Sequence, residues 1–162
     1  MTTTIEQVEV FGIKMPLLNS FTTGGVAKSD TKALVVRLTA SDGAIGISSV
    51  DATTNSPDTV PELTETLRER IAPALIGNNS TNIHQILELT RSLALSQPSA
   101  VVAIEMAAID LTCQQLDLPL YDYLGGAVEE RLALNGWIGM LPPDEAAVEA
   151  QRWLDAGFLS SK

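Results

Sequence analysis

The stretch Ala103-Ile-Glu-Met-Ala-Ala-Ile-Asp-Leu-Thr-Cys-Gln-Gln-Leu-Asp-Leu-Pro-Leu-Tyr-Asp-Tyr-Leu-Gly-Gly126 decides how this chain folds. Its first half continues a helix that we expect to begin at Pro98, because proline fits the first helical turn, where its missing N–H needs no partner. The expected helix runs to about Leu116 and is apolar almost all round, as is typical of a helix buried on every side. We therefore expect it to be the central helix of its domain.

Three strands are expected upstream of this helix. Ile5–Met15 alternates polar and apolar residues with a period near two, Ala33–Thr39 is rich in β-branched residues, and Ile45–Val50 follows after Asp42-Gly43. Asp-Gly between two such runs is a strong hairpin signal, because both residues can adopt positive φ at low cost. The sequence thus predicts a three-stranded antiparallel sheet.

Two amphipathic helices should separate the sheet from the central helix. The second begins at Asn82, whose side chain can cap the first turn together with Gln85. The first ends at Gly77 and carries one apolar stripe with spacings of three and four: Val60, Leu63, Leu67, Ile71 and Leu75. Strands followed by helices predict an α+β domain with the helices packed on one face of the sheet.

Two polar segments, Asn19–Asp30 and Asp51–Asp58, are longer than a hairpin requires and are expected to be loops. Long loops on a rigid sheet are either mobile decoration or binding elements, and the residues leave both alternatives open. Beyond Gly125-Gly126, Arg131–Met140 is expected to form a strand. An amphipathic helix and a further strand at Phe158–Lys162 should follow, which together make one parallel βα step and the start of the next.

The composition excludes several classes of function. The 162 residues contain 10 Lys+Arg against 20 Asp+Glu, a formal charge of -10 that repels phosphate backbones and anionic lipid surfaces. We expect no nucleic-acid and no membrane partner and, without a signal sequence or an apolar run of about 18 residues, a cytoplasmic location. Cys113 is the only cysteine, and the only histidine, His84, has no suitably spaced partner for a metal.

The stretch Ala103–Gly126 closely resembles the end of the N-terminal capping domain in the mandelate racemase and muconate lactonizing enzyme family of the enolase superfamily. The resemblance runs from Ile5 to Lys162 and includes the closing Ala-Gly-Phe-Leu-Ser-Ser-Lys. It implies an enolase-like capping domain at residues 1–126, made of a three-stranded sheet with a helical bundle. It also implies that residues 127–162 are the truncated start of a C-terminal (β/α) barrel, since a whole barrel needs roughly 250 residues.

The resemblance also implies a chemistry. Members of the family abstract a proton α to a carboxylate, and Mg²⁺ with neighbouring cations stabilises the resulting enediolate. Lys162 aligns with the first lysine of the family's lysine-x-lysine motif, whose second lysine would stand two positions later. The three acidic metal ligands would also lie downstream, so we expect Mg²⁺ in the full-length enzyme and none bound by this chain.

Two capping loops of the family complete the substrate pocket, and here they correspond to Phe21–Val26 and Val50–Pro57. The candidate substrate-binding residues implied by this correspondence are Phe21, Thr22, Thr23, Val26, Val50 and Thr54. Trp137 and Trp153 lie on apolar stripes and are expected to pack, with a place facing the pocket as the alternative for Trp137. Glu105 and Asp110 lie on different faces of the central helix, where we expect them to make structural hydrogen bonds.

We therefore expect the N-terminal fragment of a Mg²⁺-dependent isomerase, epimerase or lyase that acts on a small carboxylate and forms a homo-oligomer. The alternative is a noncatalytic, stand-alone capping module that mediates self-association. The segment Gly46-Ile-Ser-Ser-Val-Asp51 stands where the family often has a glycine and a glutamate, and Thr112–Gln115 replaces a common lysine. No subfamily is assigned for that reason.

Overall fold

The structure is a computed structural model that describes residues 2–23, 26–51, 58–94 and 96–162. The chain forms two compact units: Met1–Lys14 with Lys32–Gly126, and Met15–Thr31 with Ala127–Lys162. The expected domain boundary after Gly126 stays a prediction, because residues 15–31 precede it in sequence and yet join the second unit.

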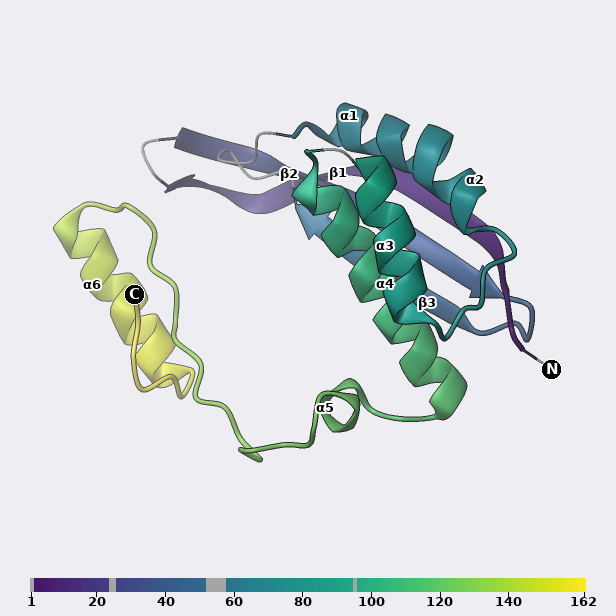
Figure 1. Cartoon of the computed structure of the whole chain (residues 1–162). Coiled ribbons are helices and arrows are strands. Elements are labelled where there is room, and N and C mark those ends of the chain that lie inside the picture. Colours follow the sequence, from purple (N-terminus) through teal and green to yellow (C-terminus); the bar gives the residue numbers. More distant parts are fainter. Residues whose placement is uncertain (1, 24–25, 52–57, 95) are drawn as a thin grey trace. The chain divides into compact units, whose positions relative to one another are not determined.

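The sheet has three strands in the order β1-β2-β3 (Figure 1), namely β1 (Ile5–Thr23), β2 (Val26–Ala40) and β3 (Ile45–Asp51). β2 and β3 are antiparallel, with Leu38 opposite Gly46 and Val36 opposite Ser48. The three-stranded antiparallel sheet with helices is confirmed. The expectation of a loop over Asn19–Asp30 was wrong, because most of this segment is strand. Ladder hydrogen bonds satisfy the backbone of such a ribbon, so its polar side chains do not prevent it from forming.

The connection between β2 and β3 differs in detail from the expected tight turn. The Gly43 N–H donates to the Ala40 carbonyl at 2.9 Å, and the Ala40 N–H donates to the Ala44 carbonyl at 2.9 Å. Gly43 has a φ of 85°, but Asp42 does not have a positive φ. Asp42 instead accepts a hydrogen bond from the Ala44 N–H, which, with a second one from Gln115, lowers the pKa of its carboxyl group. The turn is therefore longer than a two-residue hairpin and needs only one left-handed residue.

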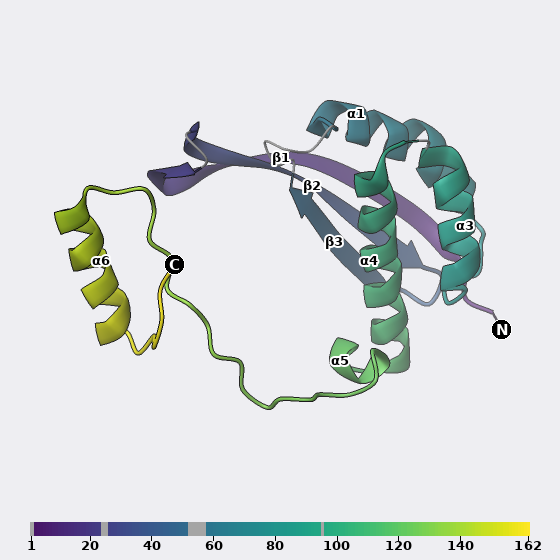
Figure 2. The same ribbon diagram turned by 60° about the vertical axis from the view of Figure 1, so that its left-hand side comes forward.

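The helices, in chain order, are α1 (Val60–Glu65), the π-helical segment η1 (Thr66–Ile71), α2 (Ala72–Leu75), α3 (Ile83–Ala94), α4 (Pro98–Leu116), α5 (Leu120–Tyr123) and α6 (Pro143–Asp155). The N-cap expected for α3 is present, since the Gln85 N–H donates to Asn82 Oδ1 at 3.2 Å. α3 and α4 pack side by side against one face of the sheet (Figures 1 and 2).

The π-helical segment η1 explains how one apolar stripe stays buried through α1, η1 and α2. Leu63, Leu67, Ile71 and Leu75 are spaced by four and are at most 1% exposed. In an α-helix with 3.6 residues per turn, each step of four residues would rotate the stripe by about 40°. The wider π turn, with i→i+5 hydrogen bonds, removes most of that rotation. All four side chains can therefore reach the core.

α4 is the buried central helix that its composition predicted. Its buried residues are Ala100, Ala103, Ile104, Ala107, Ala108, Leu111, Thr112 and Cys113. All of them except Thr112 and Cys113 join Leu34, Val36 and Leu38 of β2 in the apolar core. Because half of the buried α4 positions are alanines, the helix axis can approach the sheet closely.

Three consecutive residues of β3 contact α4 directly. A Cβ atom on Gly46 would lie 2.2 Å from the Ala107 carbonyl oxygen, so only glycine fits there. The Ile47 N–H donates to Asp110 Oδ2 at 2.7 Å, which agrees with the structural role expected for Asp110. The buried Ser48 hydroxyl donates to the Ala103 carbonyl at 2.6 Å. Together these contacts fix the position of β3 along α4.

Replacing Gly46 with alanine should destabilise the fold by about 3 kcal/mol, because the added methyl group meets backbone atoms of α4 that cannot swing away. Urea unfolding followed by circular dichroism measures the change. Gly12→Ala is the matched control, since its Cβ would lie 3.3 Å from a flexible Val60 methyl group. Equal stabilities of the two variants would contradict the close approach of β3 and α4.

Cys113 should react slowly with a thiol reagent in the folded chain. It is 5% exposed, and both burial and the nearby Asp110 carboxylate raise the pKa of its thiol. A raised pKa leaves less thiolate at a given pH, so the onset of labelling should move to higher pH than in the unfolded chain. Labelling rates measured from pH 7 to pH 10, with and without denaturant, test this. Equal rates in both states would refute it.

Candidate functional site

In the second unit, a short segment before α6 pairs in parallel with a short segment after α6. Gly136 and Ser161 form a parallel bridge. The Gly136 N–H donates to the Ser160 carbonyl at 2.8 Å, and the Lys162 N–H donates to the Gly136 carbonyl at 2.9 Å. The strand, helix, strand order expected after Gly126 is thus present, although each expected strand is reduced to this bridge.

Trp153 holds α6 against this pairing. A Cβ atom on Gly136 would lie 2.4 Å from Trp153 Cγ, so the indole occupies the space where a side chain would stand. The Trp153 Nε1–H donates to the Trp137 carbonyl at 2.8 Å. Phe158 meets the same ring edge-on, with centroids 4.8 Å apart. Trp153 therefore packs, as expected, and it orients the strand at Gly136.

The bridge and the alternation of side chains along a strand bear on which side of the strand Lys162 takes. Gly136 faces α6, and its bridge partner Ser161, together with the preceding Ser160, lines a depression of about 350 Å³ that also includes the α6 residues Ala147 and Ala150. Side chains alternate between the two faces of a strand, so we expect Trp137 and Lys162, each one position further on, on the face opposite to that of Gly136. Backbone hydrogen bonds of Lys162 with Gly136 and Ile138 hold Lys162 beside Trp137, and both side chains are exposed.

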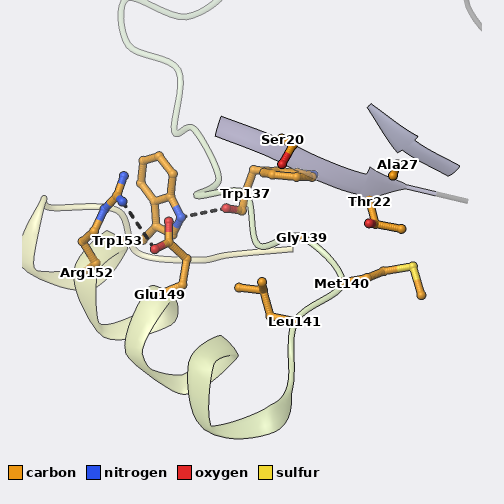
Figure 3. Close-up of a pocket in the computed structure, with 10 residues that line it drawn as sticks. All are labelled: Ser20, Thr22, Ala27, Trp137, Gly139, Met140, Leu141, Glu149, Arg152 and Trp153. Atoms are coloured by element: carbon orange, nitrogen blue, oxygen red, sulfur yellow. Dashed lines mark hydrogen bonds and ion pairs between the residues drawn. The ribbon is translucent and has the colours of Figure 1, made fainter. Parts of the chain in front are cut away.

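A cavity of about 410 Å³ lies within the second unit, near Trp137 (Figure 3). The hydroxyl-bearing residues Ser20 and Thr22 of β1 line one side, and Trp137 and Trp153 line another. An ion pair of α6, with Arg152 Nη1 3.4 Å from Glu149 Oε2, also contributes. The Arg152 side chain is 68% exposed, so this pair adds little stability and stays available to a polar ligand. Hydroxyl groups, an indole and paired charges suit a ligand that is partly apolar and partly polar.

The structure separates the candidate substrate-binding residues. Thr22 lines the cavity with Trp137, and Phe21, Thr23 and Val26 occupy neighbouring backbone positions on β1 and β2.

Val50 belongs to the first unit, where it packs partly buried against the core, and Thr54 lies outside the described residues. Lys162 does not line the cavity. Sequence analysis missed Ser20, Glu149 and Arg152. The spacing of three between Glu149 and Arg152 indicates an ion pair, but nothing in the sequence connects it with Ser20.

Within the described ranges, no three His, Cys, Asp or Glu side chains are close enough to hold a metal ion. Mg²⁺ is bound mainly by carboxylates and water in octahedral geometry. No helix in the described part of the chain is long and apolar enough to cross a membrane.

Comparison with known proteins shows that the chain is similar to the N-terminal part of racemases and epimerases. N-succinyl-L-Arg/Lys racemase of Bacillus cereus is 28% identical over 159 residues, which cover 98% of this chain and 43% of the racemase. L-Ala-D/L-Glu epimerase of Bacillus subtilis is 29% identical over 159 residues, with the same two coverages. The chain thus spans less than half the length of these relatives.

Solved structures of similar proteins also match this chain over part of their own length. The crystal structure of the Bacillus cereus racemase has a TM-score of 0.90 at 26% identity and covers 99% of this chain and 43% of its own. The dipeptide epimerase of Enterococcus faecalis, solved with Mg and L-Leu-L-Tyr, has a TM-score of 0.89 at 28% identity, with coverages of 99% and 45%.

Residues 2–125 match the family model for the mandelate racemase / muconate lactonizing enzyme N-terminal domain. The fold and these relatives agree with that match, and the chain therefore belongs to the mandelate racemase and muconate lactonizing enzyme family of the enolase superfamily.

Proposed function

We propose that this chain is the N-terminal part of a Mg²⁺-dependent isomerase, epimerase or lyase that abstracts the proton α to the carboxylate of a small substrate. Its relatives include racemases, epimerases and a cycloisomerase. The observation that carries the proposal is the parallel pairing of Gly136 with Ser161 beside α6, from which strand alternation puts Lys162 on the side opposite α6. In a (β/α) barrel the side opposite the helices is the interior, and active sites lie at the carboxyl ends of the strands.

Lys162 would act at the reacting centre as a cation or as a proton carrier. The α-proton of a carboxylate leaves behind an enediolate, and a nearby ammonium group stabilises its negative charge. A second lysine two positions along the same strand would share its face, and the mutual repulsion would favour the neutral amine that a base requires. Trp137, on the same face, would exclude water from this side of the centre.

Mg²⁺, bound by carboxylates outside this chain, would neutralise charge on the substrate carboxylate when present. The Enterococcus faecalis relative was solved with Mg, which supports this cofactor. The residues proposed to set substrate specificity are Phe21, Thr22, Thr23, Val26, Val50 and Thr54. The hydroxyl of Thr22, in the cavity beside Trp137, is the best supported of these. A cytoplasmic homo-oligomer also remains part of the proposal.

Lys162→Met in a protein that carries this chain together with a complete barrel should reduce exchange of the substrate α-proton with D₂O by about 100-fold or more. Methionine keeps the length and apolar stem of lysine while removing the amine. Lys32→Met, at an exposed position on β2, is the matched control and should keep wild-type exchange. The 162-residue chain alone should exchange nothing with or without Mg²⁺, and exchange by K162M at the wild-type rate would end the proposal.

The alternative of a self-associating capping module has its own support in the exposed apolar residues of the second unit. Val128, Leu132 and Leu159 are 96%, 79% and 89% exposed. Apolar surface of this kind favours association. If the module exists, sedimentation of the 162-residue chain should give one discrete dimer that melts cooperatively. A heterogeneous, noncooperative material would instead support a fragment that needs the rest of its barrel.

A further inference from the structure

The sheet has two edge strands, β1 and β3, and an edge presents unpaired N–H and C=O groups that can template pairing with another chain. Part of the β1 edge is occupied near its start. The Ile5 N–H donates to the Asn78 carbonyl at 2.9 Å, and the Gly77 N–H donates to the Ile5 carbonyl at 2.8 Å. Further along, the Arg68 guanidinium of η1 donates to the Val10 carbonyl, from Nε at 3.1 Å.

An acidic side chain closes the β3 edge, whereas the basic Arg68 contacts the β1 edge. The Ile47 N–H points away from β2, because it donates to Asp110 Oδ2 of α4 at 2.7 Å. Groups on the same edge alternate along an antiparallel strand, so the backbone groups of Ile45 and Ser49 also point outward. In the described part of the chain, Asp110 is the only side chain recorded as hydrogen-bonded to the outward backbone of Ile45–Ser49.

β3 itself has none of the features that usually protect an edge. Ile45-Gly-Ile-Ser-Ser-Val50 contains no charge and no proline. Ile45 and Ile47 are 41% and 53% exposed. Natural edge strands are commonly blocked by lysine, proline or a bulge, and uncharged β-rich segments without them are prone to pair. The protection of β3 must therefore come from outside the strand.

We propose that Asp110 keeps the β3 edge closed, and that without it β3 pairs with β3 of a second copy of this chain. A two-fold antiparallel pairing would place identical uncharged segments opposite each other, so no like charges would meet within the strands. In the native chain the Asp110 carboxylate occupies the Ile47 N–H and sets a negative charge beside the edge. Two copies would bring two such charges together. This inference does not depend on the proposed function.

Asp110→Leu tests it in the 162-residue chain. Sedimentation velocity over a range of concentrations should show that the D110L species has at least twice the mass of the wild type. In D110L, the Ile47 N–H should be protected from amide exchange in the associated species and unprotected in the monomer. Asp110→Asn, which keeps the acceptor oxygen, should sediment closer to the wild type than D110L does. If D110L melts below the assay temperature, Asp110→Ser, too short to reach β3, carries the same expectation.

A second substitution separates edge pairing from general misfolding. Adding Ser49→Lys to D110L places a lysine on the exposed edge, where two copies would repel each other, and should restore the wild-type mass. Ser92→Lys, an equal change of charge at an exposed position of α3, is the matched control and should leave the mass of D110L unchanged. The proposal is overturned if D110L and D110S sediment like the wild type, or if S49K and S92K act alike.

Discussion

The close approach of α4 to β3 is the contact on which the first unit depends. It is possible because Gly46 has no side chain where the backbone of α4 passes. At this distance the Ser48 hydroxyl reaches the Ala103 carbonyl, and Asp110 reaches the Ile47 N–H. A buried hydroxyl without a partner would cost about 1–3 kcal/mol, so the two hydrogen bonds follow from the approach and also reinforce it. The absence of a side chain at Gly46 thus sets the position of β3 against α4 and allows Asp110 to reach the β3 edge.

Much of this fold could be predicted from residue patterns. The apolar run of α4, the N-cap at Asn82 and the three strands each depend on local chemistry, and the structure has all of them. The patterns failed at Asn19–Asp30, where side-chain polarity indicated a loop. Pairing of one backbone with another is a nonlocal property, so polar side chains do not reveal it. The same limit applies at Arg131–Met140, where an apolar segment forms a strand bridge only at Gly136.

The residues proposed for the site come from the sequence, whereas their arrangement depends on tertiary contacts. The closing Ala-Gly-Phe-Leu-Ser-Ser-Lys singles out Lys162 by resemblance, but the packing beside its strand depends on Trp153, which fills the space over Gly136. The contact between Gly136 and Trp153 joins residues 17 apart in sequence, and neither residue type predicts it. Thr22 and Val50 were grouped by the same resemblance, yet they belong to different units, each with its own packing environment. The local sequence indicates the candidate residues, whereas tertiary contacts determine which of them lie close together.

The π-helical segment η1 has a consequence for the length of the helix that contains it. An ordinary α-helix with apolar residues at spacings of four, three and four would present one continuous stripe. Leu63, Leu67, Ile71 and Leu75 use four, four and four, which is one residue more. The wider π turn of η1 accommodates the extra residue, so the apolar residues of α1 and α2 face the same side. A helix built in this way can gain a residue without shifting the layer beneath it.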